Sequence, residues 1–347
     1  MVHCRFYYMN IPKNTIKGTI LKTQRMSTDD GPGIRSTIFF KGCPLSCAWC
    51  HNPESISPIV QVYWEKIKCI GCHSCIESCV NGAISAAKSG ILIERVLCDS
   101  CGSCARACPS AAMDIYGEVS SPLDLAREVL KDKAYFQKSG GGVTLSGGEP
   151  TMQTHFTKEL LTIFRQAGIH TALDTCGQCS WETLEELLPH TDMILYDLKE
   201  INPAKHKEFT GVSNTRILEN LALLGRFIKE QRKPHELWIR TPLIPGCTNT
   251  QDNIRGIGAF IVKHLWQSIS RWELCTFNKL CIHKYDGLGI NWKFGKSPLL
   301  SRDDAQILTL LARNSGPPPE VIHLSGPTQE SNPEESPDKN IAQSISC

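Results

Sequence analysis

The spacing of the cysteines constrains this chain more than any other feature of its sequence. Of the 18 cysteines in 347 residues, eleven fall in three short runs, and the first run is Cys43-x3-Cys47-x2-Cys50. Three thiolates at this spacing hold three corners of an iron–sulfur cube, whereas a closed cube takes four cysteines. The run therefore predicts a cluster with one iron open to a non-protein ligand. A structural zinc site or a group of inert thiols is the alternative, and only His51 is spaced to complete a zinc site.

The second and third runs repeat one pattern, Cys-x2-Cys-x2-Cys-x3-Cys, as bacterial ferredoxins do. In such doubled motifs the fourth cysteine of each run ligates the other cluster. We therefore expect a ferredoxin-like insert with two [4Fe–4S] clusters over residues 62–117. The expected ligands are Cys69, Cys72, Cys75 and Cys108 for one cluster, and Cys98, Cys101, Cys104 and Cys79 for the other. Two zinc knuckles are the alternative, but they would not explain this symmetry of the fourth cysteines.

Clustered cysteines indicate metal ligation in a reducing compartment, not a disulfide framework. The net charge of +2 gives no support for a nucleic-acid or membrane surface held by bulk charge. The first 20 residues lack the apolar core of a signal peptide, and no apolar stretch is long enough for a membrane span. We therefore expect a cytoplasmic protein. Cys176 and Cys179, with the other scattered cysteines, are expected to be packing residues.

Outside the insert the chain alternates apolar strands with amphipathic helices, which predicts an α/β fold with a parallel sheet or partial barrel. We expect an N-terminal extension over residues 1–16, the first part of the barrel over 17–61, the rest over 118–325, and a disordered tail rich in Pro, Ser and Glu over 326–347. Residues 17–26 are expected to form an edge strand. The later strands are predicted at 169–174, 193–198, 236–242 and 272–277.

Polar side chains follow the predicted strands, and the carboxyl ends of parallel strands meet at one rim of a sheet. Glu149 ends the glycine-rich segment 140–150, Asp174 and Asp197 end the next two strands, and Asn278 follows the last one. A single strand-end carboxylate is more often a helix cap than a ligand. Several of them along one rim predict a binding site.

Taken together, these motifs resemble those of the radical S-adenosylmethionine enzymes, and within them the glycyl-radical enzyme activating enzymes. The matching segments are Asp30-Gly-Pro-Gly-Ile-Arg35, the Cys43–Asn52 loop, Ser146-Gly-Gly-Glu-Pro150, Asp174-Thr175, Asp197-Leu-Lys199, Phe277-Asn278 and His283-Lys-Tyr285. The resemblance covers residues 17–290, and the doubled ferredoxin motif is like the insert of the larger activating enzymes. It implies a partial (β/α)6-type radical SAM barrel with a ferredoxin-like 2[4Fe-4S] domain inserted in it.

The resemblance also implies roles for individual residues. Cys43, Cys47 and Cys50 would hold the catalytic [4Fe–4S] cluster, whose open iron is chelated by the amine and carboxylate of S-adenosylmethionine. The other implied contacts are Trp49, Cys50 and His51 to the nucleoside, Gly148 and Glu149 to the methionyl amine, Asp197, Leu198 and Lys199 to the ribose and carboxylate, Asn278 to the adenosyl group, and Asp174 with Thr175 to a monovalent cation. Asp30, Gly31, Pro32, Gly33 and Arg35 would hold a glycine loop of the partner.

By the same resemblance, the enzyme cleaves S-adenosylmethionine reductively to a 5′-deoxyadenosyl radical, which abstracts a hydrogen from a glycine Cα of a partner glycyl radical enzyme. A flavodoxin or ferredoxin would supply the electron through the insert. One alternative is a radical S-adenosylmethionine enzyme that acts on a small molecule or peptide and carries auxiliary clusters. A second is a non-catalytic ferredoxin-like electron carrier, which would leave the Gly148–Pro150 and Asp197–Lys199 motifs unexplained.

Overall fold

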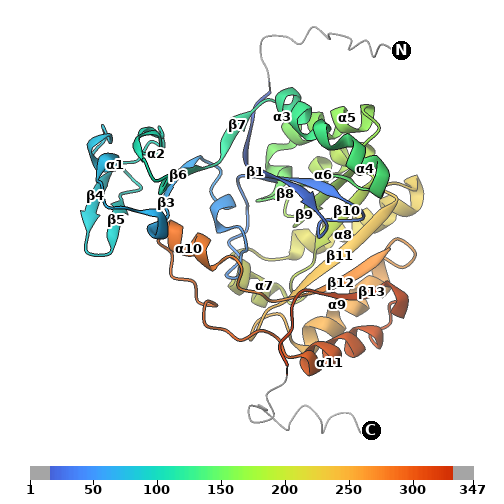
Figure 1. Ribbon diagram of the computed structural model, residues 1–347. Coiled ribbons are helices and arrows are strands. Elements are labelled where there is room, and N and C mark those ends of the chain that lie inside the picture. The colour runs from blue at the N-terminus through green and yellow to red at the C-terminus, as the bar shows by residue number, and fades with distance from the viewer. Residues whose placement is uncertain (1–15, 331–347) are drawn as a thin grey trace, which may run out of the picture.

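A nine-stranded sheet forms the centre of the molecule in a computed structural model that describes residues 16–330 (Figure 1). Seven of its strands run parallel, in the order β13-β12-β11-β10-β9-β8-β2. They are β2 (Arg35–Phe40), β8 (Gly142–Gly147), β9 (His170–Thr175), β10 (Met193–Asp197), β11 (Glu236–Leu243), β12 (Arg271–Thr276) and β13 (Ile322–Ser325). The predicted α/β fold with a largely parallel sheet is confirmed.

The antiparallel end of the sheet differs from the prediction. β1 (Gly18–Ser27) pairs with β2 on one side, but it is not an edge strand, because β7 (Glu118–Ser120) pairs with its first three residues on the other side. β7 is too short to give a strand signal in the sequence, and it follows the cysteine-rich insert immediately. The chain that leaves the insert is therefore attached to the sheet beside the start of β1.

Most of the helices pack on one face of the sheet, and the main hydrophobic core lies between these helices and the sheet. The helices are α3 (Pro122–Val129), α4 (Lys133–Ser139), α5 (Thr154–Gln166), α6 (Trp181–Leu187), α7 (Pro203–Thr210), α8 (Thr215–Gln231), α9 (Gln251–His264), α10 (Ile282–Leu288) and α11 (Arg302–Arg313). In β11, Leu237 and Ile239 are fully buried in this core, whereas the alternate residues Trp238 and Arg240 face the other side. Because side chains alternate along a strand, one face packs on helices and the other is free to line a cavity.

A small lobe, residues 61–116, extends from the side of the sheet domain (Figure 1). Its base is β3 (Gln61–Trp64) paired antiparallel with β6 (Met113–Tyr116), and its tip is the hairpin of β4 (Ile84–Ala87) and β5 (Gly90–Ile93). Two short helices, α1 (Ser74–Glu77) and α2 (Ser103–Ala107), begin after residues with positive φ at equivalent motif positions, His73 and Gly102. The doubled sequence motif thus folds into two equivalent turns.

The chain beyond β13 is more ordered than expected. Residues 326–330, assigned to a disordered tail, pack on the sheet domain: the Pro327 carbonyl accepts from Thr276 Oγ1 at 2.7 Å, and Gln329 exchanges backbone hydrogen bonds with Leu300 and Arg302. Residues 1–15 and 331–347 lie outside the described part of the chain, so the expectations for them are untested. Between residues 16 and 330, no helix is long and apolar enough to cross a membrane.

Candidate functional site

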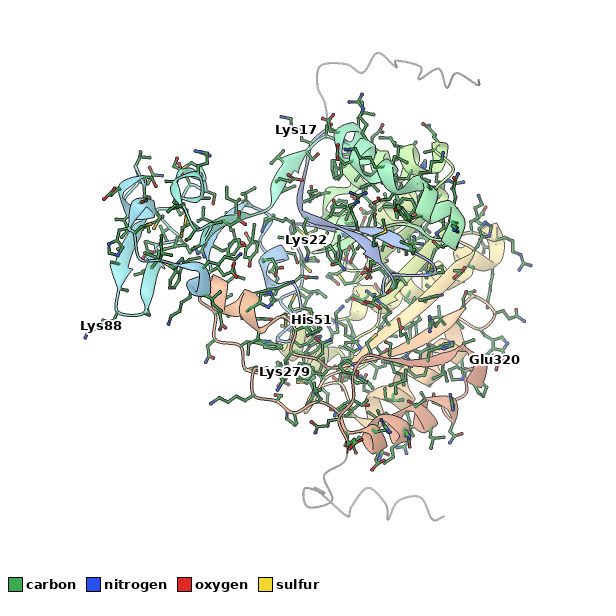
Figure 2. All side chains as sticks on the ribbon, viewed as in Figure 1. Lys17, Lys22, His51, Lys88, Lys279 and Glu320 are labelled. Carbon is green, nitrogen blue, oxygen red and sulfur yellow. The ribbon has the colours of Figure 1, made fainter. Side chains whose placement is uncertain are left out.

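A cavity of about 740 Å³ lies against the open face of the sheet, and most of the predicted site residues line it. These are Asp30, Gly31, Cys43, Cys47, Trp49, Cys50, His51, Gly148, Asp174, Thr175, Asp197, Lys199 and Asn278. His51 lies near the centre of the molecule, whereas Lys88, in the turn between β4 and β5, marks the far tip of the lobe (Figure 2). Residues from eight separate segments of the chain therefore meet in one cavity.

The cysteine loop follows β2 directly and is fixed by backbone hydrogen bonds to distant segments. Its amides at Ser46 and Ala48 donate to the carbonyls of Thr210 and Phe209 at the end of α7, at 2.8 and 3.0 Å. The Trp49 ring packs edge-on against Phe209 with a centroid distance of 6.0 Å. A loop without regular structure thus has a defined shape, with all three thiols at the cavity.

The environment of these thiols suits metal ligation. Burial raises the pKa of Cys47 to about 11 and also raises the pKa of Cys50, so both are neutral thiols without a metal. A hydrogen bond with Cys176 lowers the pKa of Cys43, and the nearby Lys199 ammonium favours the thiolate at both Cys43 and Cys47. Thiols are deprotonated when they bind a metal. Three convergent thiols beside a buried cation therefore fit an anionic thiolate-ligated cluster.

No three His, Cys, Asp or Glu side chains within residues 16–330 are grouped so as to hold a single metal ion. The case for a cluster therefore depends on the spacing and chemistry of the cysteines.

A ladder of alternating charges crosses the floor of the cavity. Arg240 donates from Nη2 to Asp174 Oδ1 at 2.6 Å and from Nε to Asp197 Oδ1 at 3.4 Å, and Lys199 Nζ donates to Asp197 Oδ2 at 2.6 Å. Burial acts to raise the pKa of Asp197, but Lys199 and Arg240 outweigh it and hold that pKa below its usual value. Burial also raises the pKa of Asp174, in this case to about 6. The ladder therefore keeps several buried charges paired.

Asp174 and Thr175, the residues expected to hold a monovalent cation, make hydrogen bonds within the protein. Besides Arg240 on one oxygen, Asp174 accepts from Ser146 Oγ on the other at 2.5 Å. The Thr175 hydroxyl donates to Glu149 Oε1 at 2.8 Å. Both side chains thus have protein partners in this structure, and the cation at Asp174 and Thr175 stays a prediction.

Glu149 is placed differently from the expectation that its side chain binds an ammonium group. It is 0% exposed and does not line the cavity. Its Oε1 accepts from Thr151 N, Thr151 Oγ1 and Thr175 Oγ1 at 2.8–3.1 Å, and its Oε2 accepts from Cys176 N at 2.7 Å. With four donors, this carboxylate joins the ends of β8 and β9. Its partners lie up to 27 residues away in sequence, so no local signal revealed this role.

Leu198 also departs from the prediction, because its side chain is 0% exposed and belongs to the main core. Its carbonyl accepts from Thr241 Oγ1 at 2.9 Å and its amide donates to Arg240 O at 3.0 Å. Leu198 therefore fixes the end of β10 between its two polar neighbours and does not contact the cavity with its side chain.

Asn278 is the polar residue that meets the cysteine loop from the end of β12. Burial lowers the pKa of His51, and the backbone carbonyl of Asn278 acts in the opposite direction. Its side-chain Oδ1 accepts from Leu280 N at 3.1 Å. Asn278 thus lines the same cavity as the cysteine loop.

The residues expected to hold a partner loop divide into two groups. Asp30 and Gly31 line the cavity, and Asp30 Oδ2 accepts from Ser27 Oγ and Thr37 Oγ1 at 2.8 and 2.6 Å. Arg35 is 0% exposed, so its side chain is not presented at the surface. Burial lowers the pKa of Arg35 to about 10.

Arg35 holds the loop together from inside. It donates to Thr144 Oγ1 and Val143 O at 2.7 Å and to Pro32 O at 3.3 Å. Gly33 has φ +69°, and a Cβ there would lie 2.4 Å from the Gly141 backbone nitrogen, so Gly33 permits a close backbone approach. Pro32, Gly33 and Arg35 therefore shape the loop that presents Asp30 and Gly31.

Two buried cysteines of the lobe, Cys75 and Cys104, each have a neighbouring thiol from the other run. Burial raises the pKa of Cys75, and the neighbouring thiols of Cys108 and Cys69 raise it further. For Cys104 the cause is again burial, with smaller effects of Cys98 and Cys79. The two fourth cysteines also accept equivalent backbone hydrogen bonds, from Ala83 N to Cys79 Sγ at 3.3 Å and from Ala112 N to Cys108 Sγ at 3.2 Å.

Sequence reasoning assigned no role to three donors around the cysteine loop, Lys284, Tyr285 and Trp292. They donate to the loop from α10 and the segment after it. The first two stand in the matched His283-Lys-Tyr285 segment, which was the available signal. Their acceptors lie more than 230 residues earlier in the chain, so the sequence did not show the contact.

Comparison with known proteins agrees with this site. Residues 37–252 match the radical SAM superfamily. The chain is 38% identical over 300 residues to the (2S)-3-sulfopropanediol dehydratase activating enzyme of Klebsiella oxytoca, which covers 85% of this chain and 93% of the relative. It is 35% identical over 310 residues to the choline trimethylamine-lyase activating enzyme of Oleidesulfovibrio alaskensis (88% and 98%) and 42% identical over 270 residues to the trans-4-hydroxy-L-proline dehydratase activating enzyme of Clostridioides difficile (77% and 86%).

The family match spans the cysteine loop, the glycine-rich segment and the charge ladder, and the relatives extend the likeness over most of the chain. The chain therefore belongs to the radical SAM superfamily and, within it, to the activating enzymes of glycyl radical enzymes.

Proposed function

We propose that this protein activates a partner glycyl radical enzyme by removing a hydrogen atom from a glycine Cα of that partner. The superfamily implies a [4Fe–4S] cluster and S-adenosylmethionine, which together supply the reductive cleavage that produces a 5′-deoxyadenosyl radical. The observation that carries the proposal is the set of three cysteines at one end of the cavity, with no fourth cysteine in their run. The activating enzymes among the relatives support the same function.

The chain's own residues would bind and orient the cofactor. Cys43, Cys47 and Cys50 would ligate the cluster, and the buried Trp49 and half-buried His51 would pack on the nucleoside. Lys199 offers a positive charge for the methionyl carboxylate, while Gly148 leaves room for the amino group to approach the backbone. Asp197 would accept from the ribose hydroxyls, and the backbone near Asn278 would complete the adenosyl side.

Exclusion of water is the second task of the cavity, because solvent would quench a carbon radical. The pairing of Asp174, Arg240 and Asp197 satisfies buried charges without water. The glycine loop of the partner would enter where Asp30 and Gly31 line the cavity, at the amino end of β2, opposite the cysteine end. The two reactants would then meet inside the protein.

The small lobe would hold two further [4Fe–4S] clusters, ligated by Cys69, Cys72, Cys75 and Cys108 and by Cys98, Cys101, Cys104 and Cys79. The neighbouring thiols that Cys75 and Cys104 have in the other run, and the equivalent amide donors to Cys79 and Cys108, support this assignment. Cys72 and Cys101 are exposed, which suits electron entry from a small donor such as a flavodoxin or ferredoxin.

Three cysteine variants test the proposal by 5′-deoxyadenosine formation from S-adenosylmethionine under anaerobic conditions with dithionite. Cys47→Ala is expected to abolish product formation, because the catalytic cluster loses one of its three ligands. Cys101→Ala is expected to retain most of it, since dithionite can reduce the catalytic cluster directly. Cys179→Ala is the matched control outside both sites, and it is expected to behave as wild type.

A wild-type protein that forms no 5′-deoxyadenosine would contradict the proposal. Equal loss in Cys47→Ala and Cys101→Ala would instead make the lobe structural. The abstraction of hydrogen from the partner's glycine is tested by mixing this protein with a candidate glycyl radical enzyme. The glycyl radical is then recorded by electron paramagnetic resonance. Product formation without that radical, across candidate partners, would favour a small-molecule or peptide substrate.

A further inference from the structure

The segment that follows the last long strand of the site, β12, contacts the cysteine loop at several consecutive residues. Tyr285 OH donates to the Cys50 carbonyl at 2.8 Å, and Lys284 Nζ donates to the His51 carbonyl at 2.9 Å. Trp292 Nε1 donates to the Ala48 carbonyl at 3.0 Å. Three of the four carbonyls from Ala48 to His51 are therefore held by side chains of one segment, residues 284–292.

Lys284 makes more of these contacts than Tyr285 or Trp292. Besides the His51 carbonyl, its ammonium group contacts Asn52 Oδ1 at 2.6 Å and Glu54 Oε1 at 2.8 Å. The side chains of Lys284 and Glu54 are only 16% and 3% exposed, so this ion pair is largely shielded from water. Lys41 Nζ donates to the Glu54 carbonyl at 2.5 Å from the other side. The turn after the cysteine loop is thus fixed between two lysines.

Aromatic packing fixes the direction of these donors. The Tyr285 ring stacks on Trp292 with a centroid distance of 4.9 Å and an interplanar angle of 13°. Phe277 and Phe294 pack on Trp292 at 5.8 and 6.2 Å. All four rings are at least 93% buried, so the phenol and indole groups have little freedom to turn away from the loop.

The opposite side of α10 faces the base of the small lobe (Figure 1). A Cβ on Gly287 would lie 3.5 Å from Tyr63 Cδ2 and 3.8 Å from Tyr116 OH, which is ordinary contact distance. Tyr63 and Tyr116 come from β3 and β6 and stack on each other at 3.7 Å. α10 is therefore packed between the lobe and the cysteine loop.

We propose that residues 282–292 form a strap that fixes the backbone of the cysteine loop against the base of the lobe, with Lys284 and Tyr285 as its positioning residues. The strap sets the directions of the Cys47 and Cys50 thiols, although neither positioning residue touches the cluster or the substrate. Groups that orient metal ligands in this way are worth about 10- to 100-fold in metal affinity or activity when they are removed. The inference takes from the proposed function only the identity of the three cluster ligands.

The test compares Lys284→Met and Tyr285→Phe with two matched controls, Lys296→Met and Tyr135→Phe, whose parent residues are exposed. Each anaerobically reconstituted and reduced protein is titrated with S-adenosylmethionine, and the change in its electron paramagnetic resonance spectrum is followed. The concentration for half of the change is expected to rise about 10-fold in both strap variants. It is expected to stay at the wild-type value in both controls. Lys284→Arg keeps the charge and is expected to recover part of the loss.

Hydrogen–deuterium exchange of residues 43–56 supplies a readout that needs no activity. Both strap variants are expected to exchange faster in this segment alone. If the strap variants match the controls in both measurements, or lose thermal stability with an unchanged response to S-adenosylmethionine, the strap is overturned. Should Lys284→Met fail to fold, Tyr285→Phe decides, because it removes one hydroxyl and keeps the ring. A wild-type protein without any spectral response to S-adenosylmethionine would refute the proposed function. Hydrogen–deuterium exchange of residues 43–56 would then be the only test of the strap.

Discussion

The sheet domain and the small lobe are held together in different ways. In the sheet domain, fully buried side chains such as Leu145, Leu195 and Leu237 run through strand after strand, and buried charges are paired. The hydrophobic cluster of the lobe has only five buried members, and two of them, Cys75 and Cys104, are expected cluster ligands. All cysteines among the described residues are free, so no disulfide in that part of the chain supports the lobe.

The difference teaches that the lobe is too small to fold by apolar burial alone. Fixing one residue costs about 1–2 kcal/mol of backbone entropy, whereas fully burying one apolar side chain contributes about 1.5–3 kcal/mol. Chains with so little core usually depend on disulfides or metals. The sheet domain should therefore be stable by itself, and the lobe should depend for its folding on the two clusters that we propose for it.

Removal of the iron–sulfur clusters is expected to give the largest difference between the lobe and the sheet domain. In the cluster-free protein, amides of residues 61–116 are expected to lose their protection against hydrogen–deuterium exchange, because little else stabilises the lobe. The amides of β8 to β11 are expected to stay protected, and they serve as the internal control. A lobe that remains protected without clusters would show that its small core is sufficient.

Arg35→Met should weaken the sheet domain and leave the lobe unchanged. The substitution leaves Thr144 Oγ1, Val143 O and Pro32 O without their buried donor, which is expected to lower the free energy of unfolding by about 2–4 kcal/mol. Urea unfolding of the cluster-loaded protein measures this loss. Arg255→Met, at an exposed position of α9, is the control. A loss below about 0.5 kcal/mol, typical of surface sites, would rule out a structural role for Arg35.

The last prediction concerns the pH dependence that Asp174 contributes to stability. Its pKa is about 6 in the folded protein and 3.8 as the ordinary value, so the folded state binds more protons between these pH values. Stability from this group is therefore present below about pH 4 and is lost as the pH rises to about 6. Relative to Asp174→Asn, wild type is expected to lose free energy of unfolding over that range, measured by urea titrations at each pH. A constant difference between the two proteins would contradict the raised pKa.

The parts of the fold that follow local patterns could be predicted from sequence. The run 193–198 became the parallel strand β10, because a strand buried on both faces is apolar almost throughout. The run 236–242 became β11, in which every second residue is buried, because side chains alternate between the two faces of a sheet. Cys43 and Asp197 reached the same cavity because the carboxyl ends of parallel strands share one rim. β7 was missed because three residues carry too little pattern.

Side-chain partners far apart in sequence could not be predicted. Glu149 and Arg35 belong to motifs of the site, but whether each side chain faces the cavity depends on acceptors and donors on neighbouring strands. The contacts of Lys284 could not be predicted either, because its acceptors at Asn52 and Glu54 lie more than 200 residues away in sequence. Spacing in the sequence gives the chemistry of such residues, whereas their direction follows from tertiary packing.

The length of β2 fixes the distance between the two loops at its ends. The loop with Asp30 and Gly31 precedes this strand, the cysteine loop follows it, and both line one cavity. Six extended residues span about 20 Å, and this strand is paired on both sides, so it cannot stretch or bend. An insertion or deletion here would change the gap between the two loops and turn the strand's side chains to the wrong faces. A change in the size of the lobe would leave the gap between the two loops unchanged, whereas a change in the length of β2 would not.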